Sequence, residues 1–220
     1  MITLGIVGVV ASITIPSLIT KYQQRVTEVK LKKMYSMLRN AEKMAVAEYD
    51  EAPEDWPQPD QPIANDWFEK YYLPFFNTAN VEHRNKIQKD SYIIRNMSGK
   101  IADTQSGGRM FTKFSDGSCI THFVNGQFYF LVYDVNCSSP PNVLGKDVWD
   151  IAEFRWSAKL YNGGWIDKRE TIPQMYNYTP AKRSDFVENC KIQTHMGGQP
   201  TTCFAVFVAD GFKFSKDLHW

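Results

Sequence analysis

Residues 1–49 read MITLGIVGVVASITIPSLITKYQQRVTEVKLKKMYSMLRNAEKMAVAEY, and this stretch decides the fold. Residues 1–20 carry no charged side chain, and about 20 apolar residues are what a helix needs to cross a bilayer. Residues 21–49 repeat apolar positions at three- and four-residue steps, as an amphipathic helix does. Asp50, Glu51 and Pro53 then end the pattern. We therefore predict one helix of about 75 Å with an apolar half and an amphipathic half.

The amphipathic half also predicts which side chains face a globular body. The expected stripe consists of Tyr22, Val26, Val29, Lys33, Met34, Met37, Leu38, Ala41, Met44, Ala45 and Glu48. The opposite face is expected to carry most of the charge, in Lys30, Lys32, Arg39, Glu42 and Lys43. Pro16 lies inside the apolar half, where it predicts a gentle kink.

The apolar opening allows three interpretations. A cleaved signal peptide would begin with a basic segment and end at small residues, and neither is clear here. A helix of a soluble core is rarely apolar on every face at a chain terminus. A membrane anchor is therefore favoured. The basic residues 21–33 would hold their side of the membrane in the cytoplasm, whereas cysteine pairing would place it outside, and the sequence leaves this conflict open.

The composition limits the function classes. The 220 residues suffice for one domain with an appendage, and 25 basic residues balance 24 acidic ones, so nucleic-acid binding by overall charge is not expected. The four cysteines, Cys119, Cys137, Cys190 and Cys203, form no CxxC motif, which makes zinc unlikely. Their even number beside an apolar N-terminal run indicates two disulfides instead, Cys119 with Cys137 across the flanks of a hairpin and Cys190 with Cys203 closing a polar loop.

The remaining chain is expected to form an α+β fold in which the long helix packs on an antiparallel sheet. The expected divisions are 1–20 and 21–50 for the helix halves, 51–108 for an irregular and helical connection, and 109–220 for the sheet. Residues 66–76 predict a short helix with Asp66 as a candidate N-cap, whose aromatic side chains cover the sheet rather than bind a partner. Strands are expected at 110–114, 119–124, 128–134, 148–156, 203–209 and 212–214, with DG and NG turns between neighbours.

No sequence motif points to catalysis. GxSxG, HExxH and P-loop patterns are absent from the sequence, and His83, His122, His195 and His219 stand singly. We therefore expect a protein that is not an enzyme.

One loop carries ligand-type side chains, the segment DVNCSSPPNVLGKDVWD at 134–150. Asp134, Asn136, Asn142 and Asp147, with Asp150 close by, supply the hard oxygen atoms that calcium prefers. Their spacing is not that of an EF-hand, and Asp and Asn also stabilise turns by binding their own backbone. Calcium stays one of two interpretations of this loop.

Several stretches together resemble a known family. The opening ITLGIVGVVASITIPSLITKYQ and its continuation VTEVKLKKMYSMLRNAEKMA resemble the N-terminal helix of type IV pilins and type II secretion pseudopilins. DVN…PPNVLGKDVW and ADGFKFSKDLHW resemble a loop and an ending of the same proteins, and Pro16 stands where such pilins carry a kinking proline. Cys137 replaces the usual glycine of the loop. Members of this family also carry a leader peptide, a methylated first residue and a glutamate shortly after it. The sequence does not contain these features, and we expect that truncation or a misplaced start has removed them.

The resemblance implies a filament subunit. Its partners would be copies of itself and other pilins or pseudopilins, an inner-membrane assembly platform, membrane lipid and, for the precursor, prepilin peptidase; no nucleic acid is expected. The implied location is the bacterial inner membrane, with a single span and the globular part extracytoplasmic. Small residues at helical spacing would let such helices approach closely, namely Gly5, Gly8, Ala11 and Ser12. The alternative is a membrane-anchored extracytoplasmic domain that binds calcium or carbohydrate and does not polymerise.

Overall fold

A computed structural model gives the fold and describes residues 2–51, 56, 64–76, 82–84, 92–104, 110–125, 128–137, 139–155, 183–192 and 202–218. Its helices are α1 (Ile2–Tyr49), α2 (Ala64–Tyr71), α3 (Arg183–Ile192) and α4 (Thr202–Ala209), with a short 3-10 helix η1 (Leu73–Phe75). Its strands are β1 (Glu82–Arg84), β2 (Ile93–Arg95), β3 (Ile101–Thr104), β4 (Met110–Lys113), β5 (Cys119–Asn125), β6 (Phe128–Asp134) and β7 (Val148–Arg155). The α+β class with a long N-terminal helix and antiparallel sheets is confirmed.

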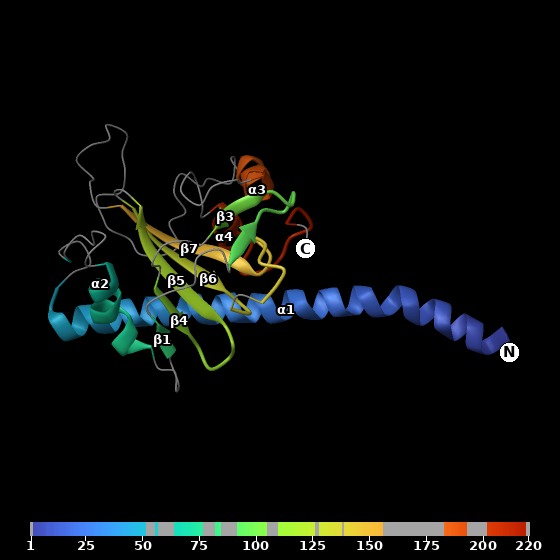
Figure 1. Cartoon of the computed structure of the whole chain (residues 1–220), viewed down its shortest axis with the longest axis horizontal. Coiled ribbons are helices and arrows are strands. Elements are labelled where there is room, and N and C mark those ends of the chain that lie inside the picture. The colour runs from blue at the N-terminus through green and yellow to red at the C-terminus, as the bar shows by residue number, and fades with distance from the viewer. Residues whose placement is uncertain are drawn as a thin grey trace.

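The predicted N-terminal helix is a single element, α1, which crosses the body and projects far beyond it (Figure 1). The ribbon bends in its dark-blue N-terminal part, and Pro16 lies inside this helix. Proline removes one backbone hydrogen bond, which accounts for a bend. The helix ends at Tyr49 because Asp50 takes a φ of 51° and donates its N–H to the Val46 carbonyl at 3.0 Å.

The buried stripe of α1 differs in part from the expected one. Its fully buried positions alternate in steps of four and three, at Thr27, Leu31, Met34, Leu38, Ala41 and Ala45. The prediction placed Tyr22, Val29 and Met44 against the body, but all three are exposed. The strict four-three spacing keeps one narrow line of side chains on the body, as in a coiled coil, so apolar residues off that line face outward.

The main sheet has five antiparallel strands in the order β1-β4-β5-β6-β7. The predicted meander is confirmed, since β5 pairs with β6 from Cys119 opposite Asp134 to Asn125 opposite Phe128. The strands β1, β2 and β3 lie within 51–108, where irregular and helical structure was expected. Each has only three or four residues, which is too short to show an alternating pattern in the sequence.

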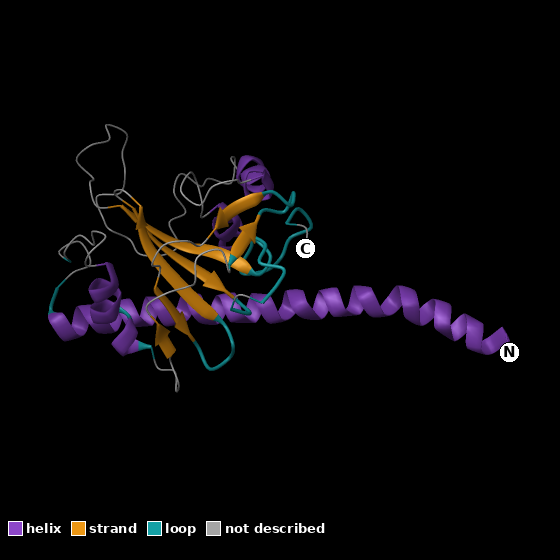
Figure 2. Cartoon of the chain, viewed as in Figure 1, coloured by secondary structure: helices purple, strands orange, loops and turns teal. Residues whose placement is uncertain are grey.

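The inner strand β6 is covered on both faces, which makes the body three-layered. Leu131 and Tyr133 belong to the cluster that includes the α1 stripe, α2 and α4. Phe130 and Val132 face the other way, into a smaller cluster with Ile94 of β2 and residues of β3 and β7. Figure 2 shows α1 along one side of the sheet and the small β2–β3 sheet apart from it. A strand buried on two faces explains why β6 reads as an almost uninterrupted apolar run.

The aromatic segment after α1 covers the core, as expected. Trp67, Phe68, Tyr71 and Tyr72 are buried in the main cluster, and Phe68 stacks on His122 of β5 with 4.3 Å between ring centroids. The expected N-cap is wrong, because α2 begins at Ala64 and Asp66 lies in its first turn. A carboxylate there still stabilises the helix through its dipole.

The predicted C-terminal hairpin is wrong. Residues 202–209 form the helix α4, and 210–214 contain no strand. The Asp210-Gly211 pair ends a helix rather than forming the turn of a hairpin. The N–H of Phe212 donates to the Phe207 carbonyl, and the N–H of Gly211 donates to the Val208 carbonyl. This is a Schellman motif, with Gly211 at a φ of 73°. Because Cys203 through Phe207 are all buried, the run carries no period that separates strand from helix.

Candidate functional site

The first feature of the site is the part of α1 that leaves the body. Ile13 and Leu18 are each 69% exposed and Tyr22 is 70% exposed, with Val9, Ile15 and Ile19 also open to solvent. Contiguous exposed apolar surface on this scale marks a place that another protein or a membrane covers. Ala11 is half-buried and Pro16 is exposed, whereas Gly5 and Gly8 lie where side chains are not described.

Within the residues that the structure describes, no helix is long and apolar enough to span a membrane.

Where α1 meets the body, polar side chains fasten it to three separate segments. The Glu28 carboxylate accepts the N–H of Phe214 at 3.0 Å, near the C-terminal end of the described chain. Lys30 donates to the Val135 carbonyl at 2.6 Å and the Asp116 carbonyl at 3.1 Å. Lys33 pairs with the Asp116 carboxylate at 3.0 Å. These contacts fix the direction in which the exposed half of α1 points.

We expect Asp116→Asn to weaken this attachment in a pH-dependent way. Burial raises the pKa of Asp116, but hydrogen bonds from Ser118 and the charge of Lys33 outweigh burial and leave the pKa below its usual value. The carboxylate therefore adds stability at neutral pH, and this contribution disappears as the pH falls through its lowered pKa. In urea unfolding, Asp116→Asn should cost about 1 kcal/mol at pH 7 and almost nothing once the pH lies below the lowered pKa of Asp116.

The control for this prediction is Glu188→Gln, which removes an exposed carboxylate from the middle of α3, away from α1 and from the helix N-terminus. It should change the free energy of unfolding little at either pH. A loss at Asp116→Asn that stays constant from pH 7 to pH 3 would contradict the argument.

The second feature is the loop at 134–150, which two buried carboxylates hold together. Asp134 accepts the N–H groups of Asn136 and Cys137, each at 2.9 Å, and the Tyr92 hydroxyl donates to its other oxygen. Asp147 accepts the N–H groups of Asn142 and Val143 at 2.9 and 2.6 Å. Burial raises the pKa of Asp147, with a further contribution from the charge of Asp134, and these effects exceed that of the two amides.

The residues expected to bind calcium are thus brought together, but the carboxylate oxygens of Asp134 and Asp147 already accept hydrogen bonds within the loop and from Tyr92. Asn136 Nδ2 also reaches Asp147, at 3.4 Å. A cation at this place would have to displace N–H donors from both carboxylates. No group of three or more His, Cys, Asp or Glu side chains that could hold a metal occurs in the described part of the chain. Calcium binding stays a prediction.

A groove of about 250 Å³ separates this loop from α1. One wall comes from α1 between Tyr22 and Lys30, and the other from the loop between Val135 and Asp147. Both walls are mainly apolar, through Val26 and Pro141 among others, with a lysine on each side. The groove therefore lies where the exposed part of α1 meets the body.

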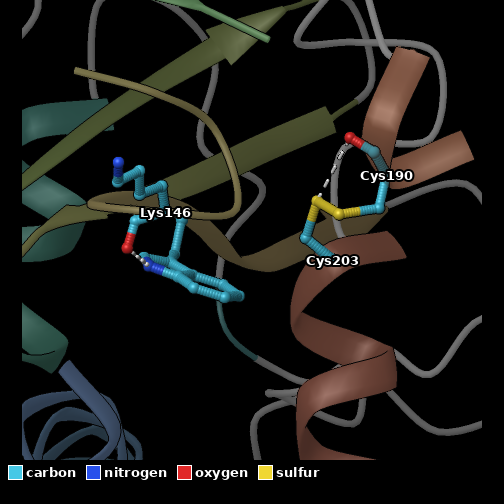
Figure 3. The surroundings of a disulfide bond; sticks show 4 residues. Lys146, Cys190 and Cys203 are labelled. Carbon is cyan, nitrogen blue, oxygen red and sulfur yellow. Dashed lines mark hydrogen bonds between the residues drawn. A yellow bond between two sulfur atoms is a disulfide. The ribbon is translucent and has the colours of Figure 1, made fainter. Parts of the chain in front are cut away.

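The third feature is a disulfide that lies against the loop at 134–150. Cys190 of α3 and Cys203 of α4 are bonded, as expected, while 193–201 between them lie outside the described residues. Figure 3 shows the bond close to Lys146. The preceding residue, Gly145, has a φ of 80°, and a Cβ placed there would lie 3.0 Å from Cys203 Sγ and 3.1 Å from Cys190 Sγ. The loop thus rests directly on the disulfide.

The expected second disulfide is not formed. Cys119 and Cys137 are both thiols, although each lies within hydrogen-bonding reach of the other. Their hydrogen bond and burial raise the pKa of the Cys119 thiol far above its usual value. The same hydrogen bond lowers the pKa of Cys137.

Comparison with known families gives one match. A family model described as a family of unknown function, DUF6613, matches residues 17–219. The chain belongs to the DUF6613 family. The residues that match the DUF6613 model include the part of α1 that packs on the body, the loop at 134–150 and both cysteine pairs. No curated protein and no solved structure matches the chain.

Sequence reasoning missed two parts of this site. The sequence does not indicate that Tyr92 contacts Asp134, because it is a single tyrosine that lies far from the loop along the chain. Lys30 was placed on a charged outer face, but its long side chain reaches back to two carbonyls of the body. Of the scattered histidines, His122 is buried against Phe68, and His195 and His219 lie outside the described residues.

Proposed function

We propose that this chain is a structural subunit of a filament of the type IV pilin or type II secretion pseudopilin kind, and that it assembles through α1. The observation that carries the proposal is the apolar surface of α1 between Val9 and Tyr22, which no part of the described body covers. In such a filament, copies of this chain cover that surface, and lipid covers it before assembly.

Two other observations support this proposal. The polar contacts of Glu28, Lys30 and Lys33 fix α1 to the body, so the exposed half can transmit a defined orientation to its neighbours. The Cys190–Cys203 disulfide suits an extracytoplasmic body, because disulfides persist in oxidising compartments. We propose a single-pass subunit of the bacterial inner membrane whose body lies outside the cytoplasm and whose partners are itself, related subunits and an assembly platform.

Cysteine crosslinking in the cell tests the proposal. In a Cys137→Ser background, a chain that carries both Gly5→Cys and Ala11→Cys should give a ladder of covalent dimers and higher multimers under mild oxidation, because helices in a filament core lie within disulfide reach. Gel electrophoresis without reductant measures the ladder. A chain that carries Ser184→Cys and Glu188→Cys, at two exposed positions of α3, is the matched control and should give much less multimer.

Only monomer from the chain with both cysteines would contradict assembly. That result would favour the alternative, an anchored extracytoplasmic binding domain that does not polymerise. A product that stops at the dimer would also contradict a filament, since a filament contact repeats along the assembly.

A further inference from the structure

We propose that Cys119 and Cys137 are a reversible dithiol–disulfide pair, in which Cys137 reacts first with an external disulfide and Cys119 completes the exchange. This inference goes beyond the filament role and does not depend on it. It rests on the placement of the two sulfur atoms, on their unequal access to solvent and on the turn that joins them.

The backbone places the two cysteines together. Cys119 begins β5 and pairs with Asp134 at the end of β6. Cys137 follows three residues later, and its N–H donates to the Asp134 carboxylate at 2.9 Å. This turn brings Cys137 back to the start of β5, close enough to Cys119 for the Cys119 thiol to lower the pKa of Cys137. Closing the bond therefore needs no change in strand pairing.

The two thiols differ in access. Cys119 is 3% exposed, so a bulky disulfide cannot approach its sulfur along the line that exchange needs. Cys137 is partly exposed and lies in the turn. The hydrogen bond with Cys119 lowers the pKa of Cys137, and Lys113 acts in the same direction, whereas burial and the Asp134 carboxylate oppose them. Cys137 is thus the more reactive nucleophile of the two.

The exchange balances as follows. The Cys137 thiolate attacks one sulfur of an external disulfide such as oxidised glutathione; that S–S bond breaks and one thiolate leaves. Cys119 then loses its proton and attacks the Cys137 sulfur, which expels the second thiolate. Two protein thiols are oxidised by two electrons, and the external disulfide is reduced to two thiols, whose thiolates take up the two protons that Cys119 and Cys137 lose.

Oxidation would change the groove described above. The new bond would tie β5 to the turn that contains Asn136, which lines the groove next to Asp147. The wall opposite α1 would then be fixed at both ends, since Gly145 at the far end of the loop already rests on the Cys190–Cys203 disulfide. The redox state of the pair therefore sets how far this wall can move.

The test uses the full chain in detergent, treated with oxidised glutathione and examined by intact mass and peptide mapping. Wild type should lose two hydrogen masses without retaining glutathione, and its Cys119 and Cys137 should become resistant to alkylation. Cys119→Ser should instead accumulate one glutathione on Cys137. Cys137→Ser should gain neither a bond nor an adduct. Cys119→Ala serves as a second variant, since an apolar residue suits this buried position.

The oxidised wild type should also melt roughly 5 to 10 °C higher than the reduced pair, with Cys190–Cys203 intact in both forms. Wild type that keeps two alkylatable thiols after treatment would overturn the proposal. So would a glutathione adduct on Cys119 in the Cys137→Ser variant, because the order of attack would then be wrong.

Discussion

Gly145→Ala should destabilise the body by about 2 to 5 kcal/mol, although it adds only one methyl group. Two costs combine at this position. The backbone has a φ of 80°, which costs a residue with a Cβ about 1–2 kcal/mol. The new Cβ would also lie 2.7 Å from Met97 Cε and within 3.1 Å of both disulfide sulfur atoms, and such crowding costs about 1–3 kcal/mol. Urea unfolding of the detergent-solubilised chain measures the sum.

Gly117 provides a control with the same backbone conformation. Its φ is also 80°, but a Cβ there would meet no atom within 4 Å. Gly117→Ala should therefore show the backbone cost alone, about 1 kcal/mol. Equal losses at the two glycines would mean that the disulfide does not limit the loop. A Cys203→Ala background should reduce the loss at Gly145, since it removes the crowding sulfur bridge.

Trp149→Ala should cause a loss of similar or larger size, about 3–5 kcal/mol. Trp149 of β7 is completely buried and packs on Phe207 and Phe214 with ring centroids 5.4 and 5.7 Å away. Its indole N–H donates to the Lys146 carbonyl at 3.2 Å, so the residue joins the core to the loop. Removing the ring leaves a cavity between sheet, α4 and loop.

Trp149→Phe separates packing from the hydrogen bond. It keeps an aromatic ring in the cluster and leaves the Lys146 carbonyl without this donor, so we expect about 1–2 kcal/mol. Tyr22→Ala is the surface control and should stay within about 0.5 kcal/mol, because Tyr22 is exposed. A Trp149→Phe variant as unstable as Trp149→Ala would show that the loop contact, rather than the core, dominates.

The sequence could predict the elements whose pattern is local. α1 shows its helical period over almost 50 residues, and β4, β5 and β6 are separated by DG and NG turns that fix their pairing. The prediction of a last hairpin is wrong because the same Asp-Gly signal also ends helices, and the burial of every side chain from Cys203 to Phe207 leaves no period that separates a strand from a helix.

The sequence could predict some of the residues that form the site, but not the contacts between them. The loop was found from its Asp and Asn residues, and the Cys190–Cys203 pairing was expected. The contacts that shape the site join distant segments, such as Tyr92 with Asp134 and Gly145 with the disulfide. Such contacts depend on how the layers pack, and one sequence contains no local signal for them.

The four-three stripe of α1 gives the projecting half of the helix the character of a lever. Its last fastening to the body lies near Thr27 and Glu28, about 37 Å from the start of the helix. A tilt of about 10° at that fulcrum would move the far end by about 6 Å, more than one helical turn. A small change in the polar contacts of Glu28, Lys30 or Lys33 would therefore produce a much larger displacement at the N-terminal end of α1.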